Sequence, residues 1–247
     1  MNTREKEVER KMNRVDLYGD EIGSVDYISH MGTDLTIVNS ARVSFGKEKT
    51  EIDEKDKKLI DYLVKHRHTS TFEHNVITFR FKVPLFVRSQ HHRHRTWSYN
   101  EISRRYTDIN IQFYEPSSYR TQHKSNRQAS TDNLVNPDLN RAISSMIPVT
   151  PYRASEAVKD HNDRSLRLYN QLIDNGVCRE QARGVLPQNL YTEYYGTTNL
   201  SNLLKFIDLR THEGAQWEIQ KVAEACLDIA KTIWPLSIES YQKNLRS

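Results

Sequence analysis

Cysteine is nearly absent from this sequence: among 247 residues there are only two, Cys178 and Cys226. They lie far apart and lack metal-type spacing, so the chain is not a disulfide scaffold, and a reducing, cytoplasmic compartment is expected. Long apolar runs are also missing, and the chain opens with charged residues instead of an apolar signal core. The sequence therefore predicts a cytoplasmic protein without a membrane-spanning segment.

A strong net charge is missing as well. The 36 basic and 32 acidic side chains leave a formal charge of +4, which is too small to mark a general nucleic-acid-binding surface. Any anion binding must therefore come from local clusters of basic residues. Apolar residues make up 36% of the chain and charged residues 28%, which predicts a very polar surface around a core that this length can bury.

The densest basic cluster lies between Arg88 and Arg105. It holds five arginines, three histidines and a single acid, Glu101, and it contains no lysine. The planar guanidinium group suits fixed, bidentate contacts with phosphate or carboxylate. Interleaved aromatic and small polar residues, such as Trp97 and Asn100, supply the stacking faces, donors and acceptors that a nucleotide pocket needs. Composition alone leaves a solvated or nonspecific polyanion-binding face as an open alternative.

The periodicity of apolar residues predicts a single α+β domain, with an antiparallel or mixed sheet flanked by long helices. We expect a charged arm at 1–14, a domain at 15–247, and a polar surface insertion at about 117–150. Asp34 is expected to cap the helix that follows it. The predicted strands are 75–83, 110–116 and 190–198. The other predicted helices are 53–66, 85–95, 153–174, 179–185, 200–210 and 215–234.

The basic cluster also contains a spaced motif, RHRxxSxNxxSxR, which runs from Arg93 to Arg105. At every specified position it resembles the signature of the flavin-dependent thymidylate synthases. Further segments resemble the same family in order, and together they cover most of residues 25–235. They are Ala41–Phe45, His66–His74, Pro84–Gln90, Ala182–Pro187, Leu190–Thr192 and Leu209–Ile219.

The resemblance implies reductive methylation of dUMP to dTMP. Methylenetetrahydrofolate would give the carbon, FAD would carry the hydride, and NADPH would reduce the flavin. The family also implies a homotetramer whose active sites are shared between subunits. Because dUMP, FAD and folate are all anionic, this function would explain a local arginine cluster in a nearly neutral chain.

The family's site residues can be carried over by motif position. The expected FAD-binding residues are His68, Ser70, Arg93, His94, Arg95, Glu101, Asn199 and Lys205. The expected dUMP-binding residues are Gln90, Arg93, Glu101, Ser103, Arg104, Arg105, Arg183 and Arg210. The resemblance makes Arg210 catalytic, because a cation beside the uracil ring stabilises developing negative charge. Two positions differ from the residues common in the family. Lys205 stands where the family often has an asparagine near the adenine part of FAD, and Gly214 replaces a histidine common near the flavin ring.

No enzyme nucleophile and no metal are expected. Cys226 belongs to the apolar face of the predicted helix 215–234, while Cys178 stands at a helix start, where a thiolate could be stabilised. Ser103 has no activating base in the sequence pattern and is expected to bind dUMP. His66 and His68 have metal-like spacing, but neither a cysteine nor a carboxylate completes a zinc site.

Two other functions remain as alternatives. One is a related flavin- and folate-dependent methyltransferase that acts on uridine in RNA. The other is a nucleic-acid-binding module that uses residues 88–105 for phosphate contacts and would bind in a salt-dependent way. The main prediction includes neither a nucleic-acid nor a membrane partner.

Overall fold

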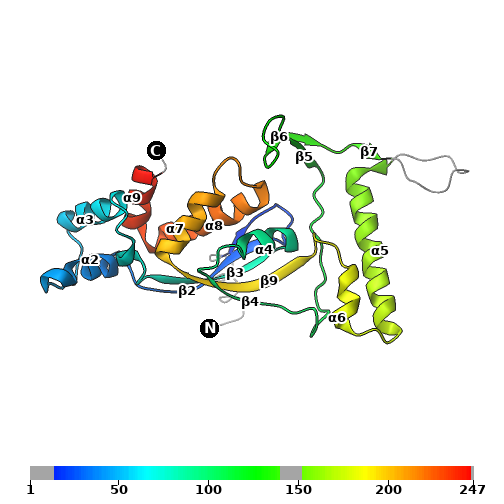
Figure 1. Ribbon diagram of the computed structural model, residues 1–247, viewed down its shortest axis with the longest axis horizontal. Coiled ribbons are helices and arrows are strands. Elements are labelled where there is room, and N and C mark those ends of the chain that lie inside the picture. The colour runs from blue at the N-terminus through cyan, green and yellow to red at the C-terminus, as the bar shows by residue number, and fades with distance from the viewer. Residues whose placement is uncertain (1–13, 140–151, 246–247) are drawn as a thin grey trace, which may run out of the picture. The chain divides into compact units, whose positions relative to one another are not determined.

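A five-stranded sheet is the largest sheet of the computed structural model, which describes residues 14–139 and 152–245 (Figure 1). Its strand order is β1-β2-β3-β9-β4. The strands are β1 (Arg14–Asp16), β2 (Ser24–Met31), β3 (Val76–Pro84), β9 (Tyr191–Asn199) and β4 (Ser98–Glu101). Strand β2 pairs antiparallel with both β1 and β3, and the register shifts at a bulge between Tyr27 and Ser29.

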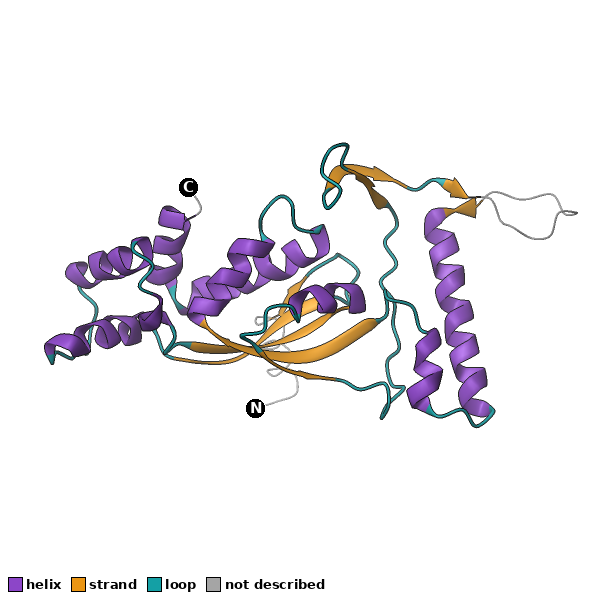
Figure 2. Ribbon diagram, in the orientation of Figure 1, coloured by secondary structure: helices purple, strands orange, loops and turns teal. Residues whose placement is uncertain are grey.

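Helices account for most of the remaining regular structure (Figure 2). They are α2 (Asp34–Arg42), α3 (Glu54–Lys65), α4 (Leu85–His91), α5 (Ala154–Asp174), α6 (Arg179–Ala182), α7 (Leu200–Arg210), α8 (Trp217–Ile233) and α9 (Pro235–Leu245). The 3-10 turns are η1 (Val43–Phe45), η2 (Thr69–Phe72) and η3 (Arg183–Val185). The predicted α+β class is thus confirmed. Within the described residues, no helix has both the length and the apolar character needed to cross a bilayer.

The chain forms two compact units, and each is built from separate segments. The first unit takes the described residues of Met1–Lys82, Gln90–Asn100 and Glu193–Ser247. The second unit consists of Val83–Ser89 and Glu101–Thr192. Apart from Arg14, which begins β1, the predicted arm at 1–14 lies outside the described residues.

The predicted alternation along residues 75–83 is confirmed by β3. The side chains of Ile77, Phe79 and Phe81 are all fully buried. Gly196 on β9 lets these rings pack closely, because a Cβ there would stand 2.8 Å from the ring of Phe81 and 3.3 Å from that of Trp97. In the same unit, α7 packs beside α8, and α8 contacts β2 (Figure 1). Buried side chains run along α8 as predicted, including Cys226.

The start of α2 differs from the prediction. Thr33, not Asp34, is the N-cap, and the hydroxyl of Thr36 accepts a hydrogen bond from the Thr33 backbone N–H at 3.0 Å. Asp34 is buried, and its carboxylate accepts the backbone N–H groups of Leu236 at 3.0 Å and Ser237 at 3.1 Å, which belong to the first turn of α9. Burial raises the pKa of Asp34, and these hydrogen bonds oppose the rise.

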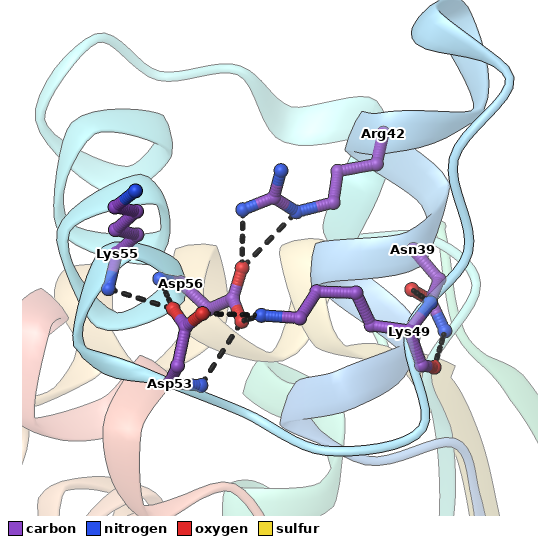
Figure 3. A network of polar contacts seen from close by, with 6 residues as sticks. All are labelled: Asn39, Arg42, Lys49, Asp53, Lys55 and Asp56. Carbon is purple, nitrogen blue, oxygen red and sulfur yellow. Dashed lines mark hydrogen bonds and ion pairs between the residues drawn. The ribbon is translucent and has the colours of Figure 1, made fainter.

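A buried carboxylate also joins α2 to α3 (Figure 3). Asp56 has no exposed surface and forms ion pairs with Arg42 and Lys49. Asp53 is the N-cap of α3, with its carboxylate accepting the N–H of Lys55 at 2.8 Å. Asn39 exchanges two hydrogen bonds with the backbone of Lys49, each 2.9 Å long. The network fixes the loop between the two helices.

The second unit has its own small core, formed by Tyr169, Ala182, Leu186 and Leu190. Helix α5 ends as predicted, with Gly176 in the left-handed region at φ +86°. The predicted helix 179–185 is confirmed as α6 followed by η3.

Two predictions in the second unit need correction. The predicted strand 110–116 is wrong, because its only ladder contact is an isolated bridge between Phe113 and Leu190. The described part of the insertion at 117–150 is more ordered than its composition indicates. It contains an antiparallel pair, β5 (Tyr119–Gln122) with β6 (Ser130–Val135), while β7 (Asp138–Leu139) pairs with β8 (Tyr152–Arg153). Residues 140–151 lie outside the description.

Candidate active site

The predicted site residues divide between the two units. The first unit holds His68, Ser70, Gln90, Arg93, His94, Arg95, Asn199, Lys205 and Arg210. The second unit holds Glu101, Ser103, Arg104, Arg105 and Arg183.

Arg210, the last residue of α7, is held by the turn that follows α4. Its Nε donates to Nε2 of His94 at 3.1 Å, and its Nη2 donates to the backbone carbonyl of Gln90 at 3.3 Å. Partial burial lowers the pKa of Arg210, although a guanidinium stays charged. Arg210 has no carboxylate partner among the described residues, so its positive charge is not compensated within that part of the chain.

His94 is neutral in this arrangement. An N–H donor from Arg210 requires an unprotonated Nε2, so the imidazole carries its proton on Nδ1. Partial burial and, to a lesser extent, the nearby charge of Arg210 lower the pKa of His94 to about 4. The hydrogen bond and the electrostatics therefore agree on the same protonation state.

An aromatic cluster fixes the turn that carries His94. The hydroxyl of Tyr99 donates to the carbonyls of His91 at 2.9 Å and His94 at 3.1 Å. Helix α4 ends at His91, four residues earlier than predicted. His91 is fully buried, and its Nδ1 lies 2.8 Å from the hydroxyl of Tyr194. Burial lowers the pKa of His91 far below its ordinary value. The ring of Phe206, on α7, packs edge-on against His94 at 4.9 Å.

Gln90 lies at the end of a short chain of side-chain hydrogen bonds. Its Nε2 donates to Oε1 of Gln216, and Nε2 of Gln216 donates to Oε2 of Glu218 at 2.9 Å. Gln216 is the N-cap residue of α8. Two polar residues at the start of α8 therefore support a residue of the predicted dUMP site.

Two further arginines of the turn remain available. Arg93 and Arg95 are both exposed, and in the described ranges neither guanidinium forms an ion pair. Together with Arg210, they give this region of the first unit three cations without a carboxylate partner in the described part of the chain. Such a group suits a ligand with several negative charges.

A pocket of about 200 Å³ lies elsewhere in the first unit and brings two predicted FAD residues together. His68 and Lys205 both line it, and so does Arg67, whose backbone is left-handed at φ +54°. Much of the remaining lining is apolar, including Leu63 and Phe72. Asp208 lines the pocket as well. Apolar side chains together with the cations of Arg67 and Lys205 suit an aromatic ligand that carries phosphate. Asn199 instead caps α7, its Oδ1 accepting the N–H of Asn202 at 2.9 Å. Ser70 is exposed in η2.

In the second unit, Glu101 is anchored by two donors on one oxygen. Its Oε1 accepts Nε of Arg88 at 3.1 Å and the hydroxyl of Thr192 at 2.6 Å. Both bonds leave Oε2 available to accept from a ligand. Glu101 also ends β4, a strand that the sequence analysis did not predict.

Ser103 and the two arginines that follow it form a turn. The hydroxyl oxygen of Ser103 accepts the backbone N–H of Arg105 at 3.2 Å, which leaves its proton free to be donated. Arg104 donates to the backbone carbonyls of Ile109 at 2.7 Å and Asn110 at 3.3 Å. The guanidinium of Arg104 thus stabilises its own loop, and its assignment to dUMP stays a prediction.

Helix α6 faces this loop through two ion pairs within the second unit. Arg105 pairs with Glu180 at 3.1 Å, and Arg179 pairs with Asp108 at 3.2 Å. Arg183 is exposed, with its Nε donating to the carbonyl of Glu180 at 3.3 Å.

The two cysteines have different surroundings. Cys178 is exposed at the start of α6, whereas Cys226 is buried and burial raises the pKa of its thiol. The buried position of Cys226 agrees with the sequence-based expectation, and a raised pKa keeps this thiol in its unreactive form.

Sequence reasoning missed four supporting residues. They are Gln216, Glu218, Glu180 and Arg67. The first two belong to a segment that resembles the family, but the resemblance gave them no role. Glu180 could have been noticed as an acid three positions before Arg183, on the same helical face. No sequence signal marks Arg67 as a pocket residue.

Comparison with known proteins identifies relatives along nearly the whole chain. A family model described as thymidylate synthase complementing protein matches residues 26–236. A flavin-dependent thymidylate synthase of Thermus thermophilus is 42% identical over 223 residues, covering 90% of this chain and 77% of the relative. A flavin-dependent thymidylate synthase of Thermotoga neapolitana is 38% identical over 221 residues, covering 90% of this chain and 91% of the relative.

Solved structures agree with these matches. The UMP/dUMP methylase PolB of Streptomyces cacaoi, bound with 5-Br dUMP, superposes with a TM-score of 0.75 at 29% identity. That match covers 93% of this chain and 97% of the other. A second structure of the same methylase, bound with 5-Br UMP, gives a TM-score of 0.73 at 30% identity. All the predicted site residues fall inside the region matched by the family model.

Proposed function

Because this chain is an enzyme of the flavin-dependent thymidylate synthase family, we propose that it methylates dUMP to dTMP. Methylenetetrahydrofolate supplies the carbon and NADPH the reducing equivalents in this proposal. The structural relative is named a UMP/dUMP methylase, which supports a uracil mononucleotide as the substrate. One observation carries the proposal. Arg93, Arg95 and Arg210 are three cations in one region, and none of them has a carboxylate partner among the described residues.

FAD is the proposed cofactor, and the first unit fits it in two respects. The pocket that contains His68 and Lys205 combines an apolar wall with cations, as an aromatic group linked to a diphosphate requires. The exposed guanidinium groups of Arg93 and Arg95 are available to phosphate oxygens. When bound, FAD would carry hydride from NADPH to the transferred carbon unit. We propose that FAD is held by His68, Ser70, Arg93, His94, Arg95, Glu101, Asn199 and Lys205.

Arg210 acts on the pyrimidine in this mechanism. Its fixed charge, which no carboxylate in residues 14–139 and 152–245 neutralises, stabilises negative charge that develops on the uracil ring, and the C5 carbon becomes more nucleophilic. His94 and the carbonyl of Gln90 hold the guanidinium in place before substrate arrives. Removal of one preorganised donor of this kind typically costs about 3–4 kcal/mol in the transition state.

The remaining residues bind and orient dUMP. Arg105 and Arg183 supply positive charge for the phosphate, and Ser103 has a hydroxyl proton to donate. Glu101, with Oε2 unused, can accept a hydrogen bond from a hydroxyl or N–H group of the nucleotide. Gln90, Arg93 and Arg104 complete the proposed set. The proposed mechanism uses neither an enzyme nucleophile nor a metal. In support of the first point, Cys226 is buried and the Ser103 hydroxyl accepts a hydrogen bond within its own turn.

The assembly is proposed from the family resemblance, and the location from the cysteine content of the sequence. We propose a homotetramer whose active sites use residues of several subunits, working in the cytoplasm without a nucleic-acid or membrane partner. Both cysteines are free thiols, which suits a reducing compartment.

One assay tests the function. The purified protein is expected to be yellow, to show a flavin absorption spectrum, and to form dTMP from dUMP when methylenetetrahydrofolate and NADPH are present. Omission of any one reagent should stop product formation. A colourless protein that forms no dTMP with every reagent and added FAD would contradict the proposal.

UMP is a second candidate substrate, because the structural relative is named a UMP/dUMP methylase. The same assay with UMP measures this directly as methylated nucleotide. Methylation of uridine in RNA under these conditions, without activity on free nucleotides, would favour the RNA methyltransferase instead.

A further inference from the structure

The orientation of the Gln90 amide can be deduced from its neighbours. An amide side chain offers a donor on one side and an acceptor on the other, and the two ends have nearly the same shape. Gln90 Nε2 donates to Oε1 of Gln216, and Gln216 Nε2 donates to Oε2 of Glu218 at 2.9 Å. The carboxylate of Glu218 determines the orientation of both amide groups.

An ionised carboxylate can only accept hydrogen bonds. The atom of Gln216 that contacts Glu218 must therefore be its NH2 group, and the atom that faces Gln90 must be its oxygen. That oxygen in turn requires the NH2 group of Gln90. The carbonyl Oε1 of Gln90 then remains as an acceptor, and it forms no hydrogen bond with the described residues.

The backbone of Gln90 contacts the proposed catalytic cation. Its main-chain carbonyl accepts from Nη2 of Arg210 at 3.3 Å, so one residue holds Arg210 and also presents a side-chain acceptor. Gln216 is itself fixed as the N-cap of α8, where its carbonyl accepts the N–H groups of Ile219 at 3.1 Å and Gln220 at 3.0 Å.

We propose that Gln216 and Glu218 are positioning residues that hold Gln90 as a hydrogen-bond acceptor. Gln90 then recognises an N–H or O–H donor of the nucleotide. This proposal rests on the proposed function, from which it takes nucleotide binding at Gln90. Two donors of dUMP have the required chemistry: the N3–H group of uracil and the 3′-hydroxyl of the deoxyribose.

Analogues of dUMP distinguish these two donors. N3-methyl-dUMP lacks the first, and 2′,3′-dideoxyuridine monophosphate lacks the second. The FAD-loaded, full-length enzyme is titrated with dUMP and with each analogue by calorimetry. Loss of one hydrogen bond to a half-buried acceptor is expected to weaken binding of one analogue about tenfold relative to dUMP.

Two variants test the relay itself. Glu218→Gln removes the carboxylate that orients the two amide groups, so both amides can flip. The ratio between the affinities for dUMP and for the weaker-binding analogue should then fall from about tenfold toward one. In the double variant Gln216→Glu with Glu218→Gln, a carboxylate at 216 accepts directly from Gln90 and the amide at 218 donates to it. The discrimination should return in this double variant, which a merely structural role would not produce.

Glu224→Gln is the matched control. It removes the same charge from the same helix, where Glu224 pairs with Lys221 at 2.7 Å, away from Gln90. Its discrimination should equal that of the unmodified enzyme. Gln216→Met, which deletes both hydrogen bonds with a side chain of similar size, replaces Glu218→Gln if that variant does not fold.

Several results would overturn the proposal. They are equal binding of dUMP and both analogues, full discrimination in Glu218→Gln, and failure of a folded double variant to recover it. In each of these cases the enzyme still binds dUMP, so the proposed function stands. An unmodified enzyme that does not bind dUMP at all would instead remove the proposed function, and this inference with it.

Discussion

Nε of Arg210 donates to Nε2 of His94 over 3.1 Å, while no carboxylate in the described residues pairs with the guanidinium. The pair joins the end of α7 to the turn after α4, two segments separated by more than a hundred positions in the chain. It explains how one cation can be held rigidly without being neutralised.

Arg210→Ala should abolish most turnover while leaving flavin bound. The variant lacks the preorganised charge, and we expect a loss of about 10²–10³ in kcat. The measurement is dTMP formation, together with the absorption spectrum of the bound flavin. Arg164→Ala is the control, because Arg164 pairs with Asp160 on α5 in the second unit. Near-normal turnover in Arg210→Ala would contradict its catalytic assignment.

Histidine titration should make the protein less stable in mild acid. The pKa of His94 is lowered to about 4, and that of buried His91 is lowered as well. The unfolded chain takes up these protons first, so the free energy of unfolding should fall as pH decreases from about 6.5 toward 4. His94→Gln keeps a side-chain acceptor but cannot titrate. Denaturant unfolding at several pH values should therefore show a shallower decrease for this variant, and an unchanged slope would contradict the assignment.

Asp56→Asn should destabilise the first unit. The substitution leaves the charges of Arg42 and Lys49 without their shared carboxylate, and we expect a loss of about 2–3 kcal/mol in the free energy of unfolding (Figure 3). Glu54→Gln is the control, because its pair with Lys57 is exposed and contributes little.

The same residue predicts a second pH effect. Burial alone would raise the pKa of Asp56, but the hydrogen bonds from Lys49, from the Asp53 backbone and from Arg42 outweigh burial and hold it well below its usual range. Its stabilisation is therefore complete above about pH 4 and is lost as pH falls further. Acid unfolding of Asp56→Asn should lack this component, and identical acid unfolding profiles would argue against the network.

Glu180→Gln should strengthen dUMP binding slightly. Glu180 occupies the guanidinium of Arg105 in an exposed ion pair, which typically contributes about 0.2–1 kcal/mol. Release of this pair should lower the KM for dUMP by up to about fivefold with kcat unchanged. Asp108→Asn breaks the neighbouring pair with Arg179 and serves as the control. A raised KM in Glu180→Gln would show that the carboxylate supports binding instead.

Replacement of both cysteines by alanine should leave turnover intact. Cys226 is buried, so Cys226→Ala is expected to cost about 1–2 kcal/mol of stability without altering the chemistry. Cys178 is exposed at the start of α6 and touches none of the site residues in the described hydrogen bonds. Loss of dTMP formation in Cys178→Ala alone would revive a covalent mechanism.

The sequence predicts best where a local pattern is repeated. The alternation of β3 and the apolar face of α8 extend over many residues, and both elements are confirmed. Helix α9 is not predicted, because Pro235 ends the apolar pattern of α8, although proline is well suited to the first position of a new helix. Strand β4 was missed because its partners come from distant segments.

The candidate site shows the same limit. Spacing and resemblance identified Arg93, His94 and Arg210, but no local pattern relates His94 to Arg210, which are 116 positions apart. The link between Gln90 and Gln216 spans 126 positions. Such contacts depend on tertiary packing, and residues with supporting roles are therefore the ones that sequence reasoning overlooks.

Asp34 makes the placement of α2 depend on α9. Its buried carboxylate accepts the N–H groups of Leu236 and Ser237, which lie 202 and 203 positions further along the chain. Removal of α9 would leave this carboxylate in the interior without those donors, and a buried acceptor without a partner is costly. We therefore expect the two helices to dock and to come apart together.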